Sequence, residues 1–163
     1  MTEKIAVIGA GMMGGAIVKS LLKSGYSGKI TATDFQLERI KEMEKLGVHA
    51  TSDNRKAATE SAIVFIVVKP ADVEKVLKEI RKEIAGKLVI SVAATVPLKF
   101  LKRIVPEARF VRIMPNVAAM VQASYTAYSC DADVTEKDKT KVKALLNMMG
   151  ICAEVNEKYM DAI

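Results

Sequence analysis

The chain has 163 residues, of which 50% are hydrophobic and 27% are charged, and its formal net charge is +6. This length supports one hydrophobic core, and no apolar stretch reaches the roughly 18 residues of a membrane span. Cys130, Cys152 and the single His49 are too scattered for a disulfide framework or a metal site, so we interpret the cysteines as core residues. The lysines follow helical patterns, so we expect no nucleic-acid or membrane partner, and without a signal-peptide pattern we expect a cytoplasmic protein.

The first predicted strand, residues 5–8, leads into a glycine-rich turn and then into an amphipathic helix that ends near Gly25. The turn fits the pattern G-x-G-x-x-G at Gly9, Gly11 and Gly14. In dinucleotide-binding proteins the first glycine permits the turn, the second lets the backbone approach a pyrophosphate, and the third lets the helix pack on the strand. The pyrophosphate then lies at the helix N-terminus, where free N–H groups and the helix dipole favour an anion.

A second predicted strand, residues 29–33, ends at Asp34, twenty residues after Gly14. A carboxylate at this position accepts hydrogen bonds from the hydroxyls of the adenosine ribose. The glycine pattern alone recurs in many turns. The strand before it, the helix after it and the acidic residue together predict a dinucleotide-binding site.

The rest of the chain alternates between helical patterns and apolar, β-branched runs. We expect helices from Asp34 to Gly47, after a cap at Asp53, from Pro70 to Ala85, after Pro97, and from a capping box at Thr135 to Gly150. We expect strands at residues 48–51, 62–68, 88–92, 109–114, 124–130 and 151–155. This alternation predicts an α/β fold of the Rossmann-like, doubly wound type, with a mostly parallel sheet and helices on both faces, in a single domain over residues 1–163.

Four segments of the chain carry a family resemblance, namely residues 8–13, 67–70, 90–94 and 111–116. In order and spacing they resemble pyrroline-5-carboxylate reductases, and Asn54 also matches a family asparagine near the adenosine side of the cofactor. The family reduces the cyclic imine 1-pyrroline-5-carboxylate to L-proline, in proline biosynthesis, with NADPH or NADH. The resemblance implies that this chain is the NAD(P)-binding domain of such an oxidoreductase.

The resemblance also implies which residues bind each part of the cofactor. The pyrophosphate would be held by Ile8, Gly9, Ala10, Gly11, Met12 and Met13, and the adenosine half by Asp34 and Asn54. The middle of the cofactor would lie against Val67, Val68, Lys69 and Pro70, and the nicotinamide against Val92, Ala93 and Ala94. Pro115 and Asn116 would border the site of hydride transfer. No catalytic residue is assignable within the chain.

Some of these residues also fit simpler roles. Lys69 can merely lead the chain into the next helix, so that only its backbone touches the cofactor. Asn54 can be a turn residue that bonds its own backbone. Arg112 can be an edge or surface charge, while Met12 and Met13 can pack the helix and present only their N–H groups.

Two positions depart from the pattern of the family. Family members commonly have glycine where this chain has Thr95, so either the backbone there is strained at positive φ or the loop runs differently. Asp34 stands where NADPH-using members have small or basic residues, with Arg39 a helical turn further on. A carboxylate about 4 Å from a 2′-phosphate would cost roughly 4 kcal/mol at an effective dielectric near 20. We therefore expect NADH to be favoured, with NADPH possible.

The family continues beyond the length of this chain into a helical domain, which binds the substrate carboxylate and forms the homo-oligomer. By resemblance, the chain is therefore expected to be weakly active or inactive alone, although the whole enzyme acts on a small imine. Two other interpretations remain open. One is a related two-domain NAD(P)-dependent dehydrogenase of the hydroxy-acid or deazaflavin type, and the other is a free-standing nucleotide-binding module without catalysis.

Overall fold

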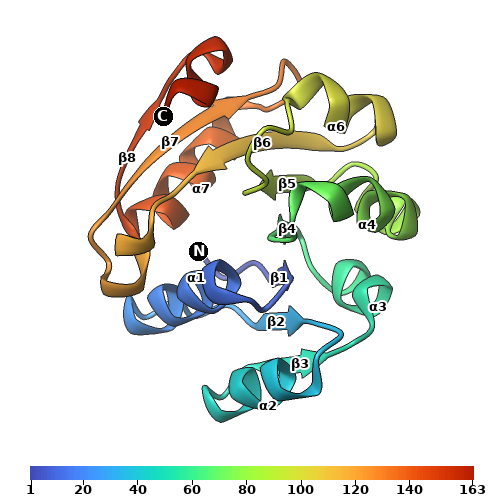
Figure 1. Ribbon diagram of the computed structural model, residues 1–163, viewed down its shortest axis with the longest axis vertical. Helices are drawn as coiled ribbons and strands as arrows, with labels where there is room; N and C mark the ends of the chain where they lie inside the picture. The colour runs from blue at the N-terminus through green and yellow to red at the C-terminus, as the bar shows by residue number, and fades with distance from the viewer.

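Eight strands form one sheet in the computed structural model, which describes residues 1–163 (Figure 1). The strands are β1 Ile5–Ile8, β2 Ile30–Thr33, β3 His49–Thr51, β4 Ile63–Ile66, β5 Leu88–Ser91, β6 Arg109–Met114, β7 Ser124–Cys130 and β8 Gly150–Glu154. The α-helices are α1 Met12–Lys23, α2 Leu37–Lys45, α3 Asn54–Thr59, α4 Val73–Glu79, α5 Arg81–Ile84, α6 Leu98–Ile104 and α7 Glu136–Asn147. Three 3-10 helices complete the fold: η1 Pro70–Asp72, η2 Val117–Val121 and η3 Glu157–Ala162. None of these helices is long and apolar enough to cross a bilayer.

The strand order is β3-β2-β1-β4-β5-β6-β7-β8, and every pair is parallel except β6 with β7. Ile8 at the end of β1 pairs with Thr33 on one side and Ile66 on the other, so these strands end level with each other. The chain reverses its direction of winding between β1 and β4, and doubly wound sheets bind ligands at such a switch point. The predicted Rossmann-like, mostly parallel α/β fold is confirmed.

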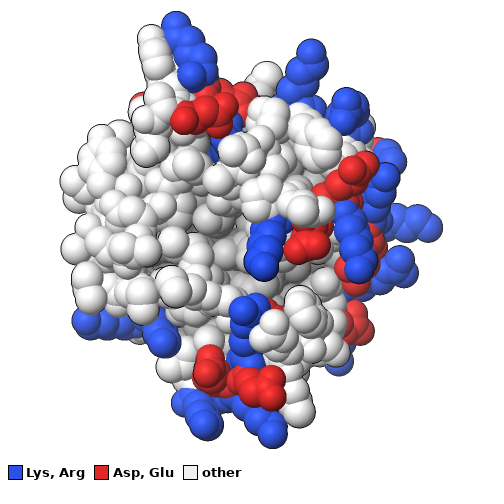
Figure 2. Space-filling model, in the orientation of Figure 1, with Lys and Arg blue, Asp and Glu red and all other residues white.

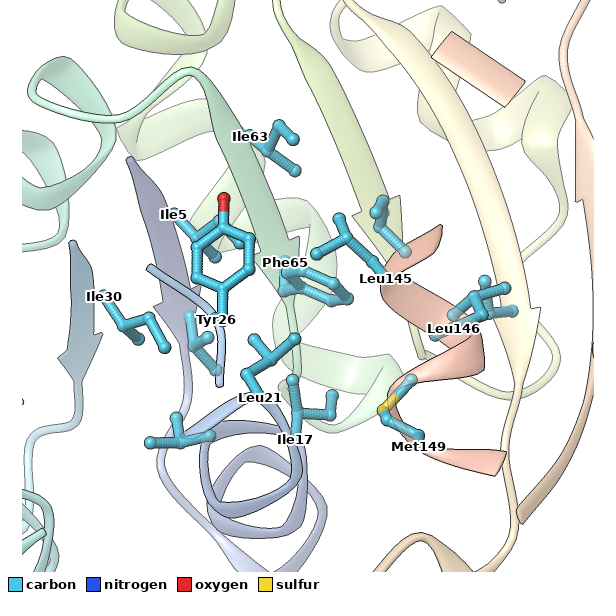
Figure 3. Close-up of a cluster of buried hydrophobic side chains, with 14 of the residues drawn as sticks. Ile5, Ile17, Leu21, Tyr26, Ile30, Ile63, Phe65, Leu145, Leu146 and Met149 are labelled. Carbon is cyan, nitrogen blue, oxygen red and sulfur yellow. The ribbon is translucent and has the colours of Figure 1, made fainter. Parts of the chain in front are cut away.

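Hydrophobic side chains cover both faces of the sheet, which explains why the strand segments are apolar without alternation. On one face, Ile5 and Val7 pack with α1, α2 and α7, and Figure 3 shows Tyr26 and Phe65 in this layer. On the other face, Ala6 packs with the helices α3 to α6 in a second hydrophobic cluster, so the sheet separates two core layers where the length predicted one core. The central strands are therefore fixed from both sides, and their carboxyl ends are held in a defined position.

Several element boundaries differ from those predicted. The helix expected from Pro70 to Ala85 consists of η1, α4 and α5, because Ile80 leaves helical geometry with φ −104° and ψ 14°. The strand expected at residues 62–68 is shorter, and the last long helix ends at Asn147. The short segments η2 and η3 were not predicted, because they have no hydrophobic period long enough to identify.

The capping box at Thr135 is confirmed. The Thr135 hydroxyl accepts a hydrogen bond from the Asp138 N–H at 3.1 Å, and the Asp138 carboxylate accepts one from the Thr135 N–H at 3.1 Å. Aspartate therefore fills the place in which glutamate or glutamine is usual. The same carboxylate pairs with Arg109 at 2.6 Å and so joins the start of α7 to β6.

Cys130 and Cys152 are free thiols that pack against the core on the face of α1 and α7. Both are only half-buried, so their interpretation as core residues holds in part. Burial raises the pKa of the Cys130 thiol to about 11, with a smaller contribution from the negative charge of Glu154. The Cys130 thiol is therefore protonated at neutral pH.

Candidate functional site

The residues predicted to bind a cofactor follow the ends of neighbouring strands. Gly9 follows β1, Asp34 follows β2, Val67 follows β4, Val92 follows β5 and Pro115 follows β6. Because these strands are parallel neighbours in the sheet, their carboxyl ends form one edge. The structure therefore brings together segments that lie up to about a hundred residues apart in the sequence, at the edge where doubly wound folds bind ligands.

The first and third glycines of the loop leave no room for a side chain. Gly9 has φ +104°, and a Cβ atom there would lie 2.2 Å from the carbonyl oxygen of Val67. A Cβ atom on Gly14 would lie 1.9 Å from the carbonyl oxygen of Gly9. Gly9 thus permits the tight turn beside β4, and Gly14 permits α1 to start directly against that turn.

The N-terminus of α1 is open to an anionic group. Gly11 is the N-cap residue, no side chain caps the helix, and its first turn contains no acidic residue. The first N–H groups of a helix have no acceptor within the helix. The nearest atom to a Cβ built on Gly11 is the Arg39 Nη1 atom, at 3.6 Å, so the backbone can be approached closely. This arrangement fits the diphosphate of a dinucleotide.

Asp34 is buried and ties the end of β2 to the glycine loop. Its Oδ2 atom accepts hydrogen bonds from the Ala10 N–H at 3.0 Å and from the Arg39 guanidinium at 3.4 Å. Its Oδ1 atom accepts a hydrogen bond from the Gln36 N–H at 2.9 Å. A carboxylate has about four acceptor positions, so these three bonds leave capacity for a further donor such as a ribose hydroxyl.

Asn54 lies beside the end of β2 and belongs to a side-chain network. Its Oδ1 atom accepts a hydrogen bond from the Thr33 hydroxyl at 2.6 Å, and its Nδ2 atom donates to Glu79 at 3.2 Å. The alternative in which Asn54 bonds its own backbone is therefore wrong. As predicted, the residue that caps α3 is Asp53, whose carboxylate accepts a hydrogen bond from the Lys56 N–H at 2.9 Å.

The loop after β5 contains a left-handed residue. Thr95 has φ +63°, so the first of the two alternatives for this position is correct and the backbone is strained. Ahead of it in the loop after β5, Ala93 is buried and Ala94 is exposed. After the neighbouring strand β6, Asn116 caps η2 by accepting a hydrogen bond from the Ala118 N–H at 3.1 Å. Lys69 precedes η1 as its N-cap residue, in extended conformation.

Charged side chains are unevenly distributed around this edge. Figure 2 shows Lys, Arg, Asp and Glu gathered over α2, α3 and α4, whereas the area over η2 and β7 has few. Exposed apolar side chains of that area include Val117, Met120, Val121 and Tyr125. The two ends of the candidate site therefore differ, with charges near the glycine loop and uncharged surface near Asn116.

The alternative in which Arg112 is an edge or surface charge is wrong. Arg112 is only 1% exposed in β6, between β5 and β7. Its guanidinium lies 3.4 Å from a Glu157 carboxylate oxygen and also pairs with Asp161. Neither carboxylate was predicted from the sequence. The sequence feature that could have indicated such partners is an arginine within an apolar strand, because a buried guanidinium needs acidic partners.

Comparison with known proteins identifies relatives along nearly the whole chain. The pyrroline-5-carboxylate reductase of Methanosarcina acetivorans is 35% identical over 99% of this chain, which covers 62% of that protein. The structure of a pyrroline-5-carboxylate reductase from Coxiella burnetii has a TM-score of 0.93 at 30% identity, with 98% of this chain and 62% of that chain covered. The Plasmodium falciparum pyrroline carboxylate reductase with NADP bound has a TM-score of 0.88 at 25% identity and is covered to 60%.

The chain therefore spans about 60% of the length of these relatives. The resemblance to pyrroline-5-carboxylate reductases that four short segments indicated is confirmed along the chain, and the fold is that of nicotinamide-dinucleotide-binding oxidoreductases. Residues 4–95 match the family described as "NADP oxidoreductase coenzyme F420-dependent". Since this match covers more than half of the chain, the protein belongs to that family of oxidoreductases.

Proposed function

We propose that residues 1–163 form a single dinucleotide-binding domain of an enzyme that reduces 1-pyrroline-5-carboxylate to L-proline. The observation that carries the proposal is the uncapped N-terminus of α1, which follows a turn where neither Gly9 nor Gly14 has room for a Cβ atom. The similarity to pyrroline-5-carboxylate reductases supports the reaction.

Each segment of the sheet edge has its own part in the proposed binding mode. The backbone of residues 8–13 binds the diphosphate, with the N–H groups of Gly11, Met12 and Met13 at the helix end. Asp34 and Asn54 bind the adenosine half, from the ends of β2 and the start of α3. The backbone of residues 67–70 lines the middle of the cofactor, since the Val67 carbonyl lies against the glycine loop.

The nicotinamide half lies over the ends of β5 and β6. Small side chains at Ala93 and Ala94 let the ring approach the backbone, while Pro115 and Asn116 border its other side. When bound, the reduced nicotinamide supplies a hydride for the imine carbon, and the imine nitrogen must also receive a proton. None of the four residues is a proton donor. By resemblance to the family, we place the donor and the group that binds the substrate carboxylate outside residues 1–163, so that the chain alone turns over slowly or not at all.

NADH is the proposed preference, by a small margin. A 2′-phosphate placed about 4 Å from the Asp34 carboxylate would be repelled by roughly 4 kcal/mol at an effective dielectric near 20. Arg39, 3.4 Å from the same carboxylate, offsets part of this repulsion. The balance of these two side chains sets the selectivity.

Calorimetric titration of the chain with NADH and NADPH tests the proposal. Wild type is expected to bind NADH more tightly, and Asp34→Ser is expected to reverse the order. Glu38→Gln, an exposed carboxylate on α2, is the matched control and leaves both affinities unchanged. If wild type binds neither nucleotide, the proposed function is wrong. If Asp34→Ser leaves the order unchanged, only the assigned role of Asp34 is wrong.

The family description also favours a second candidate, because it names coenzyme F420. In that case the enzyme would transfer a hydride between NADP and a deazaflavin. The two candidate functions are distinguished by assays of NADPH consumption with either 1-pyrroline-5-carboxylate or F420 as the acceptor. These assays use the full-length protein. Turnover with F420 as acceptor, and none with 1-pyrroline-5-carboxylate, would replace the first proposal by the second.

A further inference from the structure

The segment η3 supplies two carboxylates to one buried guanidinium. Arg112 is 1% exposed, and its Nη1 and Nη2 atoms face Glu157 and Asp161 respectively. Its Nε atom is buried and has no hydrogen-bond partner. Removing an arginine from water is costly unless acidic groups pair with it. The position of the Arg112 side chain therefore depends on η3.

Glu157 forms a second contact that joins η3 to another element. The same Oε1 atom that faces Arg112 accepts a hydrogen bond from the backbone N–H of Leu98 at 2.6 Å. Leu98 is the first residue of α6, and its N-cap residue is Pro97, which provides no side-chain cap. One carboxylate thus bridges the start of α6 and the middle of β6.

These two anchor points lie next to the two walls of the proposed nicotinamide site. Leu98 is four residues after Ala94, and Arg112 is three residues before Pro115. Between Ala94 and Leu98 the loop contains Thr95 in the left-handed conformation. A strained backbone persists only where surrounding contacts hold it. Glu157 supplies such a contact at the end of this loop.

We propose that Glu157 is a positioning residue that sets the spacing between the loop after β5 and the end of β6, and that Asp161 assists it by fixing Arg112. This inference rests on the proposed function, because the spacing matters only if a nicotinamide binds between these walls. Glu157 acts through Leu98 and Arg112 and does not touch the cofactor. The adenosine half is proposed to lie at β1, β2 and α3, so its affinity does not depend on η3.

Titration of the full chain with NADH and with ADP-ribose, which lacks the nicotinamide, tests the inference. Wild type is expected to bind NADH more tightly than ADP-ribose. Glu157→Ala is expected to weaken NADH binding about fivefold, the lower end of typical coupling between sites, and to leave the affinity for ADP-ribose unchanged. Glu157→Gln keeps an acceptor for the Leu98 N–H and is expected to restore part of the loss.

Glu136→Gln, in an exposed carboxylate of α7, is the control and changes neither affinity. An equal loss for both ligands in Glu157→Ala would indicate a merely structural role and overturn the inference, as would NADH affinity equal to that of wild type. A wild-type chain in which NADH and ADP-ribose bind equally would overturn it too. If wild type binds neither ligand, the proposed function fails along with the inference, so the two failures are distinguishable.

Discussion

The Asp34 carboxylate accepts a hydrogen bond from the Ala10 N–H at 3.0 Å, and this bond ties the end of β2 to the turn after β1. The same carboxylate also accepts hydrogen bonds from the Gln36 N–H and from the guanidinium of Arg39. Asp34 therefore shapes the glycine loop before any nucleotide arrives. Its substitution is expected to change the stability of the protein as well as its cofactor preference.

Asp34→Asn is expected to lower the free energy of unfolding by about 2 kcal/mol without nucleotide, because hydrogen bonds to a charged acceptor are lost and an amide N–H₂ faces N–H donors. Urea denaturation followed by circular dichroism measures this change. Glu38→Gln removes an exposed carboxylate from the first turn of the following helix, α2, and serves as the control. An unchanged urea midpoint in Asp34→Asn would show that the charge of the Asp34 carboxylate contributes nothing to the stability of the fold.

Adjacent glycines in α1 give a matched pair of substitutions. Gly14→Ala would place a Cβ atom 1.9 Å from the Gly9 carbonyl oxygen, so we expect a loss of about 3 kcal/mol in stability and disruption of the loop. Gly15→Ala would meet only the end of Met43 at 3.6 Å, and alanine favours the helix by up to about 1 kcal/mol. Thermal unfolding of both variants is the measurement. Equal melting temperatures would refute the assigned role of Gly14.

Thr95 occupies a conformation that glycine adopts at no steric cost. Thr95→Gly is expected to raise the free energy of unfolding by about 1 kcal/mol, because a β-branched residue at φ +63° is strained by more than the extra entropy that glycine adds to the unfolded chain. Thr95→Ala is the control, since it keeps the Cβ atom and should gain less. A destabilised Thr95→Gly protein would mean that the threonine side chain compensates for its backbone strain.

The positions of the central strands along the chain could be predicted, because each is a short apolar run followed by a turn residue. The glycine pattern and Asp34 also predicted which strand ends meet, since parallel strands share one carboxyl edge. Local signals sufficed there. The break at Ile80 was not predictable, because its apolar side chain continues the helical period and its backbone geometry depends on tertiary packing.

The partners of Arg112 show the other limit of the sequence. Glu157 and Asp161 lie 45 and 49 residues away from it and belong to a short 3-10 segment without a periodic pattern. No local propensity links them to β6. An arginine inside an apolar strand indicates that acidic partners exist, but only the fold identifies which of the chain's 19 acidic residues they are.

Tyr26 makes the stability of the protein depend on alkaline pH. Its buried hydroxyl donates to the Glu3 carbonyl oxygen, and burial, followed by the Glu3 charge, raises its pKa from 10.0 to about 12. The unfolded chain therefore loses this proton first, so the contribution of Tyr26 to the free energy of unfolding is complete below pH 10 and is lost progressively as the pH rises toward 12.

Tyr26→Phe is expected to be less stable by about 1 kcal/mol at pH 8 and to lose less stability than wild type above pH 10. Urea titrations at several pH values measure both slopes, with the exposed Tyr159→Phe as the control. Parallel profiles for Tyr26→Phe and wild type would contradict the assignment, because Cys130, which titrates in the same range, is common to both proteins.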